Sequence, residues 1–457
     1  MASTGNTLAH SLQPRHVTMI SLGGIIGAGI FVGSSSAIHI AGPGVLLTYA
    51  MCGLLVFVIM RMLGEMAMAR PGVGSFTGYA ALGLGPWAGF VAGWLYFYFW
   101  VVTIAVEAIA GANMLTNLLP LPAGAPNWLI SAGLIVLMAL VNLMSVRTFG
   151  EFEFWFATLK VATIIGFVLL GVAFIFGFGP GIGILAATFA AHGGPLPLGW
   201  GAVFIAIPVV IFSMMGSEVA TIAAVETENP AQNVVRAART VTLRILFFYL
   251  GSIAVIVAIV PWDQVIQGSS PFASAMTIIH VPGAAGFIAL VIFTAVVSCL
   301  NSAIYVTSRM LFEMAERGDA PALFATVSKS RVPAPAILVT SLAGFAVVLT
   351  SIVSPDHVFT FLLESSGATI LSVYSLIALA QIALRRRLQA QGEALSVKVW
   401  LFPWVSYALI AGIVAVLVMM AVTPDQKMQV GLCAAMFLFV LAMYAFWKRR
   451  PSAARYA

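Results

Sequence analysis

The feature that most constrains this chain is a series of twelve apolar runs, each long enough to cross about 30 Å of hydrocarbon. A backbone inside lipid must satisfy its own hydrogen bonds, and a helix does so within one segment. The composition agrees, with 61% hydrophobic and 8% charged residues and a mean hydropathy of +1.06. We therefore predict an all-α integral membrane protein with spans near residues 17–37, 44–69, 87–114, 128–146, 154–178, 202–225, 241–261, 285–308, 336–353, 358–381, 400–421 and 429–447.

Basic residues lie between the apolar runs rather than in one patch. We therefore expect the positive charges to set the orientation of the helices in the membrane, and the net charge of +6 does not predict a nucleic-acid partner. If the first loop is placed outside, all but two of the 21 lysines and arginines fall on the inner side. The two exceptions are Lys427, in an outer loop, and Lys160, within a span. The positive-inside rule then places both termini in the cytoplasm.

The first span contains four glycines in seven residues, within the stretch Ser21–Phe31. Each glycine costs a helix about 1 kcal/mol relative to alanine, which favours an interrupted helix. Freed backbone groups at this depth are tolerated only in buried or cavity-lining positions, and the half-helix after a break directs N–H groups at the cavity. We predict that a substrate carboxylate binds at Ile26, Gly27, Ala28 and Gly29. The alternative is a glycine face for close helix packing.

The sixth span carries a second unusual sequence. Pro208 is followed by the group Gly216-Ser-Glu218, where a spanning helix should be plain. This pattern predicts another break, with further substrate contacts from Phe212, Ser213, Met215 and Gly216. Two interrupted helices that meet at the midplane are typical of transporters built from inverted repeats.

The matching breaks and span counts predict one transporter domain over the whole chain, built from two halves of opposite orientation. Residues 1–16 form a cytoplasmic N-terminus, 17–178 the first repeat and 202–381 the second. Residues 400–447 add two helices outside the repeat, and 448–457 form a cytoplasmic tail.

Short motifs are spread along the chain at Arg15–Ser21, Arg61–Met66, Gly150–Trp155, Glu226–Pro230, Ser298–Ser302, Ser308–Phe312, Arg317–Pro321 and Gly392–Ser396. Together they resemble the amino acid permeases of the amino acid–polyamine–organocation (APC) superfamily, and the likeness runs from about residue 12 to 408. Within that family the chain is most similar to bacterial γ-aminobutyrate permeases. The resemblance implies an APC-like (LeuT-like) five-plus-five helix fold in the bacterial inner membrane.

Two places depart from the γ-aminobutyrate permeases. Those proteins tend to have a proline before the glutamate of span three, where this chain has Ile104-Ala-Val-Glu107, and phenylalanines where it has Met214-Met215. The resemblance implies that both places line the pocket for the substrate side chain. Proline, β-alanine and aromatic amino acids therefore stay open as alternative substrates.

Lys160 lies about 9 Å inside the fifth span, where a lysine costs about 2.5–3.5 kcal/mol on insertion scales. It is either an interfacial anchor or a functional group. The resemblance implies that it stands where sodium-coupled relatives hold their ion. We therefore expect proton coupling without sodium, with Lys160 donating to the carbonyl of Gly24 and to Ser298 and Ser302. The alternative role of that serine face is contact between helices.

Three other side chains need an interpretation. Glu107 either contacts the distal ammonium of a substrate or is a half-solvated carboxylate of the outer vestibule. Glu218 follows the second break, where a carboxylate in the first turn of a half-helix gains from the positive end of the helix dipole, so we expect a structural role. Phe212 lies just before the second break and is expected to cover the cavity, as the resemblance implies for the aromatic residue of span six.

No residue pattern predicts an enzyme, a metal site or an organic cofactor, and no soluble segment is large enough to hydrolyse ATP. The prediction is a gradient-driven transporter that imports γ-aminobutyrate or a related small zwitterionic amino acid with protons. Its expected partners are that substrate and membrane lipid, and the sequence makes no prediction of oligomeric state. A sensor with the same fold that does not transport is the alternative from another class.

Overall fold

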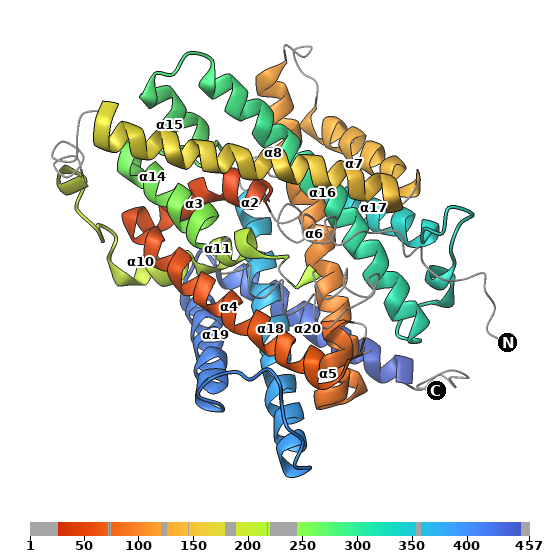
Figure 1. Cartoon of the computed structure of the whole chain (residues 1–457). Helices are drawn as coiled ribbons and strands as arrows, with labels where there is room; N and C mark the ends of the chain where they lie inside the picture. The colour runs from red at the N-terminus through yellow and green to blue at the C-terminus, as the bar shows by residue number, and fades with distance from the viewer. Residues whose placement is uncertain are drawn as a thin grey trace.

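The computed structural model describes residues 26–71, 73, 75–119, 126–144, 146–178, 189–216, 218–219, 245–352 and 358–448. Within these ranges every regular element is a helix (Figure 1). The α-helices are α2 Ala28–Phe31, α3 Gly33–Ala41, α4 Val45–Ala69, α5 Phe76–Leu84, α6 Pro86–Leu118, α7 Asn127–Met144, α8 Val146–Ala173, α10 Gly199–Ile205, α11 Ile207–Met214, α14 Ser252–Ile259, α15 Pro271–Ile279, α16 Ala284–Glu316, α17 Ala334–Val348, α18 Val358–Ala390, α19 Trp404–Val422 and α20 Lys427–Lys448. Two π-helical segments, η2 Phe174–Phe178 and η3 Ile245–Gly251, lie beside α8 and α14.

The predicted all-α membrane fold is confirmed. In the described part of the chain, nine helices are long and apolar enough to cross a membrane, and shorter apolar helices cover Gly199–Met214 and Phe247–Ile259. One of the nine, Gly33–Ala69, joins α3 to α4 through a turn at Gly42–Gly44. The start of the first predicted span lies outside the described residues, as does the end of the sixth. The count of twelve spans stays a prediction.

The helices differ in how far they are covered. In α6, 83% of the most apolar stretch is buried, whereas in α20 the share is 11%. The long α6 packs along α16 and also against α5, α7, α17 and α18, so it lies at the centre of the bundle (Figure 1). Polar side chains of α6 contact both the start of α2 and the residues after α11, through Glu107 and Tyr96.

A buried ion pair joins α4 to α18. Arg385 donates to Glu65 at 2.9 Å, and Gln381 donates to the other carboxylate oxygen at 2.7 Å. The same glutamate accepts from the backbone N–H of Val399, and Arg385 donates to the Val399 carbonyl. These contacts explain a buried glutamate near the end of the apolar helix α4, because a buried carboxylate is tolerated when its oxygens are paired.

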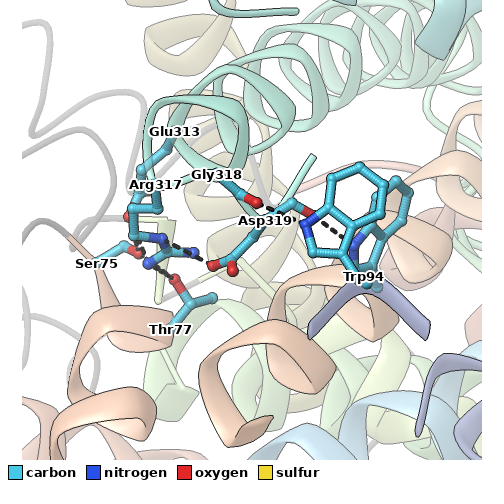
Figure 2. A network of polar contacts seen from close by, with 8 residues as sticks. Ser75, Thr77, Trp94, Glu313, Arg317, Gly318 and Asp319 are labelled. Atoms are coloured by element: carbon cyan, nitrogen blue, oxygen red, sulfur yellow. Dashed lines mark hydrogen bonds and ion pairs between the residues drawn. The ribbon is translucent and has the colours of Figure 1, made fainter. Parts of the chain in front are cut away.

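A second polar network ties the end of α16 to the start of α5 (Figure 2). The guanidinium of Arg317 donates to Glu313 at 3.1 Å and to Thr77 at 2.6 Å, and its Nε lies 3.4 Å from Asp319. Ser75 donates to the same oxygen of Glu313. The network assigns a structural role to the motif that begins at Arg317, because it fixes the turn after α16 against the start of α5.

Candidate functional site

The described part of the first span begins at Ile26, and the short helix α2 starts at Ala28. The half-helix predicted before the first break lies outside the described residues. A second irregularity at Val32 separates α2 from α3. The backbone N–H of Ala28 lies 3.0 and 2.9 Å from the two carboxylate oxygens of Glu107, which comes from α6. A carboxylate is stabilised at a helix N-terminus by the unpaired N–H groups and the helix dipole. Glu107 thus accepts from the backbone N–H group that the sequence analysis predicts to bind the substrate carboxylate.

The second break follows α11. Met215 is extended, and Gly216 has a φ of 100°, a left-handed conformation that favours glycine. The N–H of Gly216 donates to Glu218 at 3.1 Å. The hydroxyl groups of Tyr96 and Tyr374 donate to the two oxygens of the same carboxylate, at 2.8 and 3.2 Å. Glu218 therefore links the sixth span to α6 and α18. The predicted end of a half-helix before Gly216 is confirmed, and the half-helix predicted after it lies outside the described residues.

The two breaks meet. A Cβ placed on Gly29 would lie 2.8 Å from the backbone Cα of Ser213 and 3.2 Å from the Phe212 ring. The Phe212 ring also packs 5.8 Å from that of Phe99, and the carbonyl of Ser213 accepts from Tyr249. The structure thus brings together the predicted substrate residues of the two spans. All those from Ile26 to Gly29 and from Phe212 to Gly216 are buried.

Lys160 is fully buried in α8, and it faces a carboxylate that the sequence prediction did not include. Its ammonium Nζ lies 3.8 Å from Oε1 of Glu153, on the same helix. Ser298 of α16 donates to the other oxygen, Oε2, at 2.8 Å. Glu153 therefore contacts both Lys160 and Ser298, and the direct donation from Lys160 to Ser298 stays a prediction. Ser302 is buried one helical turn further along α16, and Gly24 lies outside the described residues.

A signal for Glu153 existed in the sequence. It precedes Lys160 by seven residues, or two helical turns, which places both side chains on one face of a helix. The fifth span was predicted to begin at residue 154, whereas α8 begins at Val146. That difference moves Glu153 from a loop into the buried part of the helix.

The middle of α16 lies between Glu107 and Glu153. A Cβ on Gly27 would lie 2.5 Å from Glu107 and 2.6 Å from Cys299, whose neighbour Ser298 contacts Glu153. On the next turn, Asn301 accepts from Asn142 of α7 at 2.8 Å, a contact between helices. Glu107 and Glu153 therefore both lie beside the same segment of α16.

The start of α2 and the end of α11 meet beside buried charged side chains, inside a bundle of apolar helices. This arrangement defines a multi-pass membrane protein with an internal polar site. A family model described as Amino acid permease matches residues 16–455. The chain belongs to this family.

Similar proteins include permeases for different amino acids. A γ-aminobutyric acid permease of Bacillus subtilis is 46% identical over 98% of this chain and 96% of its own. A γ-aminobutyric acid permease of Escherichia coli K12 is 43% identical, with 98% and 97% coverage. An aromatic amino acid transport protein of Corynebacterium glutamicum is 38% identical over 94% of each chain. The family and the class of cargo, amino acids, follow from these matches.

Proposed function

We propose that this protein is a secondary active transporter, and not an enzyme, that imports γ-aminobutyrate or a close analogue together with protons. The observation that carries the proposal is the 43–46% identity to relatives named γ-aminobutyric acid permeases over nearly the whole chain. It works by alternating access in the bacterial inner membrane, with both termini in the cytoplasm. A permease for proline, β-alanine or an aromatic amino acid is the second candidate, supported by the aromatic transporter at 38% identity. A sensor of the same fold is the third.

The contact between Glu107 and Ala28 suggests how the carboxylate binds. A substrate carboxylate needs the same N–H group, which lies 2.9–3.0 Å from the Glu107 oxygens. Two carboxylates cannot share one donor at low cost, because like charges repel strongly in a buried site. The substrate therefore displaces Glu107 from the helix terminus. The freed carboxylate can then pair with the distal ammonium of a linear ω-amino acid.

The pair of Lys160 and Glu153 supplies a group that can carry the coupling proton. An ammonium and a carboxylate 3.8 Å apart in a fully buried site attract each other strongly, and removal of one charge leaves the other uncompensated. A proton lost from Lys160 or gained by Glu153 therefore changes how α8 holds α16. This is a two-state element biased by one proton, which coupling requires. The ammonium also supplies the positive charge of a sodium ion, so sodium is not required.

Substrate choice is tested by competition. The purified full-length protein is reconstituted in proteoliposomes, and uptake of labelled γ-aminobutyrate is measured with an excess of unlabelled γ-aminobutyrate, β-alanine, proline, alanine or phenylalanine. We expect γ-aminobutyrate to compete best and phenylalanine least. Stronger competition by proline or phenylalanine would assign the protein to the second candidate function. Binding of γ-aminobutyrate without any uptake would instead identify a sensor.

A further inference from the structure

An apolar groove of about 690 Å³ lies on the surface of the helix bundle, between α4, the turn joining α10 to α11, and α19. Helix α10 packs against both α4 and α19 (Figure 1). Some of the lining side chains are open to the surroundings, and Leu54 is 64% exposed. Other residues along the groove are Met51, Leu55, Phe204, Gly412 and Met419.

The length of the groove suits a lipid chain. Its wall on α19 runs from Val405 to Met419 in steps of three and four residues, so one stripe of the helix faces it over the full length. This stripe is about 21 Å long at 1.5 Å per residue. One leaflet of a bilayer contributes about 15 Å of hydrocarbon, half the usual thickness. An acyl chain can therefore lie in the groove over the whole depth of its leaflet.

One end of the groove is basic and aromatic. Trp400 lines this end, and the guanidinium carbon of Arg61 lies 4.8 Å from the centre of its ring. The Nε of Arg61 donates to the carbonyl of Lys398 at 3.1 Å, which brings a second cationic residue to the same place. Among the residues that the structure describes, no carboxylate forms an ion pair with Arg61. The terminal NH₂ groups of its guanidinium are thus open to an anion from outside the protein.

We infer that this groove binds an anionic phospholipid, with an acyl chain along α19 and the phosphate at Arg61 and Lys398. Basic residues beside an apolar surface between transmembrane helices are suited to anionic headgroups. Tryptophan is typical of the depth where headgroups meet hydrocarbon. A zwitterionic lipid offers the same chain without the net charge, so the site distinguishes lipids by headgroup.

The test compares two lipids on the delipidated, detergent-purified full chain. Phosphatidylglycerol and phosphatidylethanolamine with identical acyl chains are titrated separately, and retained lipid is counted by native mass spectrometry. We expect phosphatidylglycerol to be retained more strongly. Arg61→Gln should weaken its binding about fivefold and leave phosphatidylethanolamine unchanged. The matched control is Arg331→Gln, which removes the same charge from an exposed residue of the loop before α17.

The groove itself is tested by filling it. Gly412 lines the groove, and a Cβ on it would meet no atom within 4 Å, so Gly412→Leu introduces bulk without an internal clash. Gly431 on α20 is equally open, which makes Gly431→Leu the control. We expect only Gly412→Leu to reduce retention of phosphatidylglycerol. Equal retention of the two lipids by the wild type would overturn the inference. So would variants at Arg61 or Gly412 that behave like their controls.

Discussion

The contact between the two breaks predicts a specific effect of one methyl group at Gly29. In Gly29→Ala the new Cβ would lie 2.8 Å from the Cα of Ser213, whereas ordinary contacts begin at 3.4 Å. The opposing atom belongs to the backbone, so α2 and α11 must separate by about 0.6 Å, the difference between these distances. Overpacking of this kind costs about 1–3 kcal/mol.

The cost should appear mainly in substrate binding, because the displaced segments carry the predicted site. If the closed, substrate-bound state bears the full cost, the affinity for γ-aminobutyrate falls about 5- to 150-fold. Binding of labelled substrate to purified protein measures this directly, and the melting temperature in detergent reports on folding. The matched control is Gly133→Ala in α7, where the added Cβ meets no atom within 4 Å.

The control should bind substrate as the wild type does and be stabilised slightly, since alanine favours a helix by about 1 kcal/mol over glycine. Normal affinity in folded Gly29→Ala would refute the reasoning. It would mean that substrate does not bind where the two interrupted helices meet. Loss of folding in Gly29→Ala, with the control intact, would instead show that the contact is needed for the fold itself.

Three further predictions concern charged groups. Glu107→Gln should weaken binding of γ-aminobutyrate more than that of a neutral α-amino acid, and equal effects in a binding assay would exclude Glu107 from substrate selection. Glu65→Ala should destabilise the protein by about 3–5 kcal/mol because it leaves Arg385 buried without its carboxylate; denaturant unfolding measures this, and no change would contradict it. Arg70 holds the pKa of Glu393 below its usual range through two hydrogen bonds of 2.7 Å. The pair should therefore stabilise at pH 7, and the difference in melting temperature between wild type and Arg70→Gln should disappear as the pH falls through that lowered pKa. A difference that persists at low pH would argue against the pair.

The long helices, the start of α2 and the end of α11 were predictable, because each depends on a local pattern. Runs of apolar residues determine the spans, and the glycines before Phe31 and the Pro208 to Gly216 segment mark the interruptions. The short helices α5 and α15 were not predicted, since each has nine residues and falls below the length of a span.

The contacts inside the site were less predictable. Glu107 and Ala28 are separated by 79 residues, and their meeting depends on how α6 is rotated against the first span. No local pattern contains that rotation. The sequence therefore identified Glu107 and Lys160 as unusual but not their partners in the fold.

The central claim is that a proton gradient drives amino acid uptake through Lys160. Its most direct test uses sodium-free proteoliposomes holding either the wild type or Lys160→Ala, with labelled γ-aminobutyrate and an imposed inward proton gradient. The account predicts that the wild type concentrates the substrate. Lys160→Ala should exchange labelled for unlabelled γ-aminobutyrate but not accumulate it against its gradient. Accumulation by Lys160→Ala under the proton gradient alone would contradict the account and leave Lys160 a structural residue.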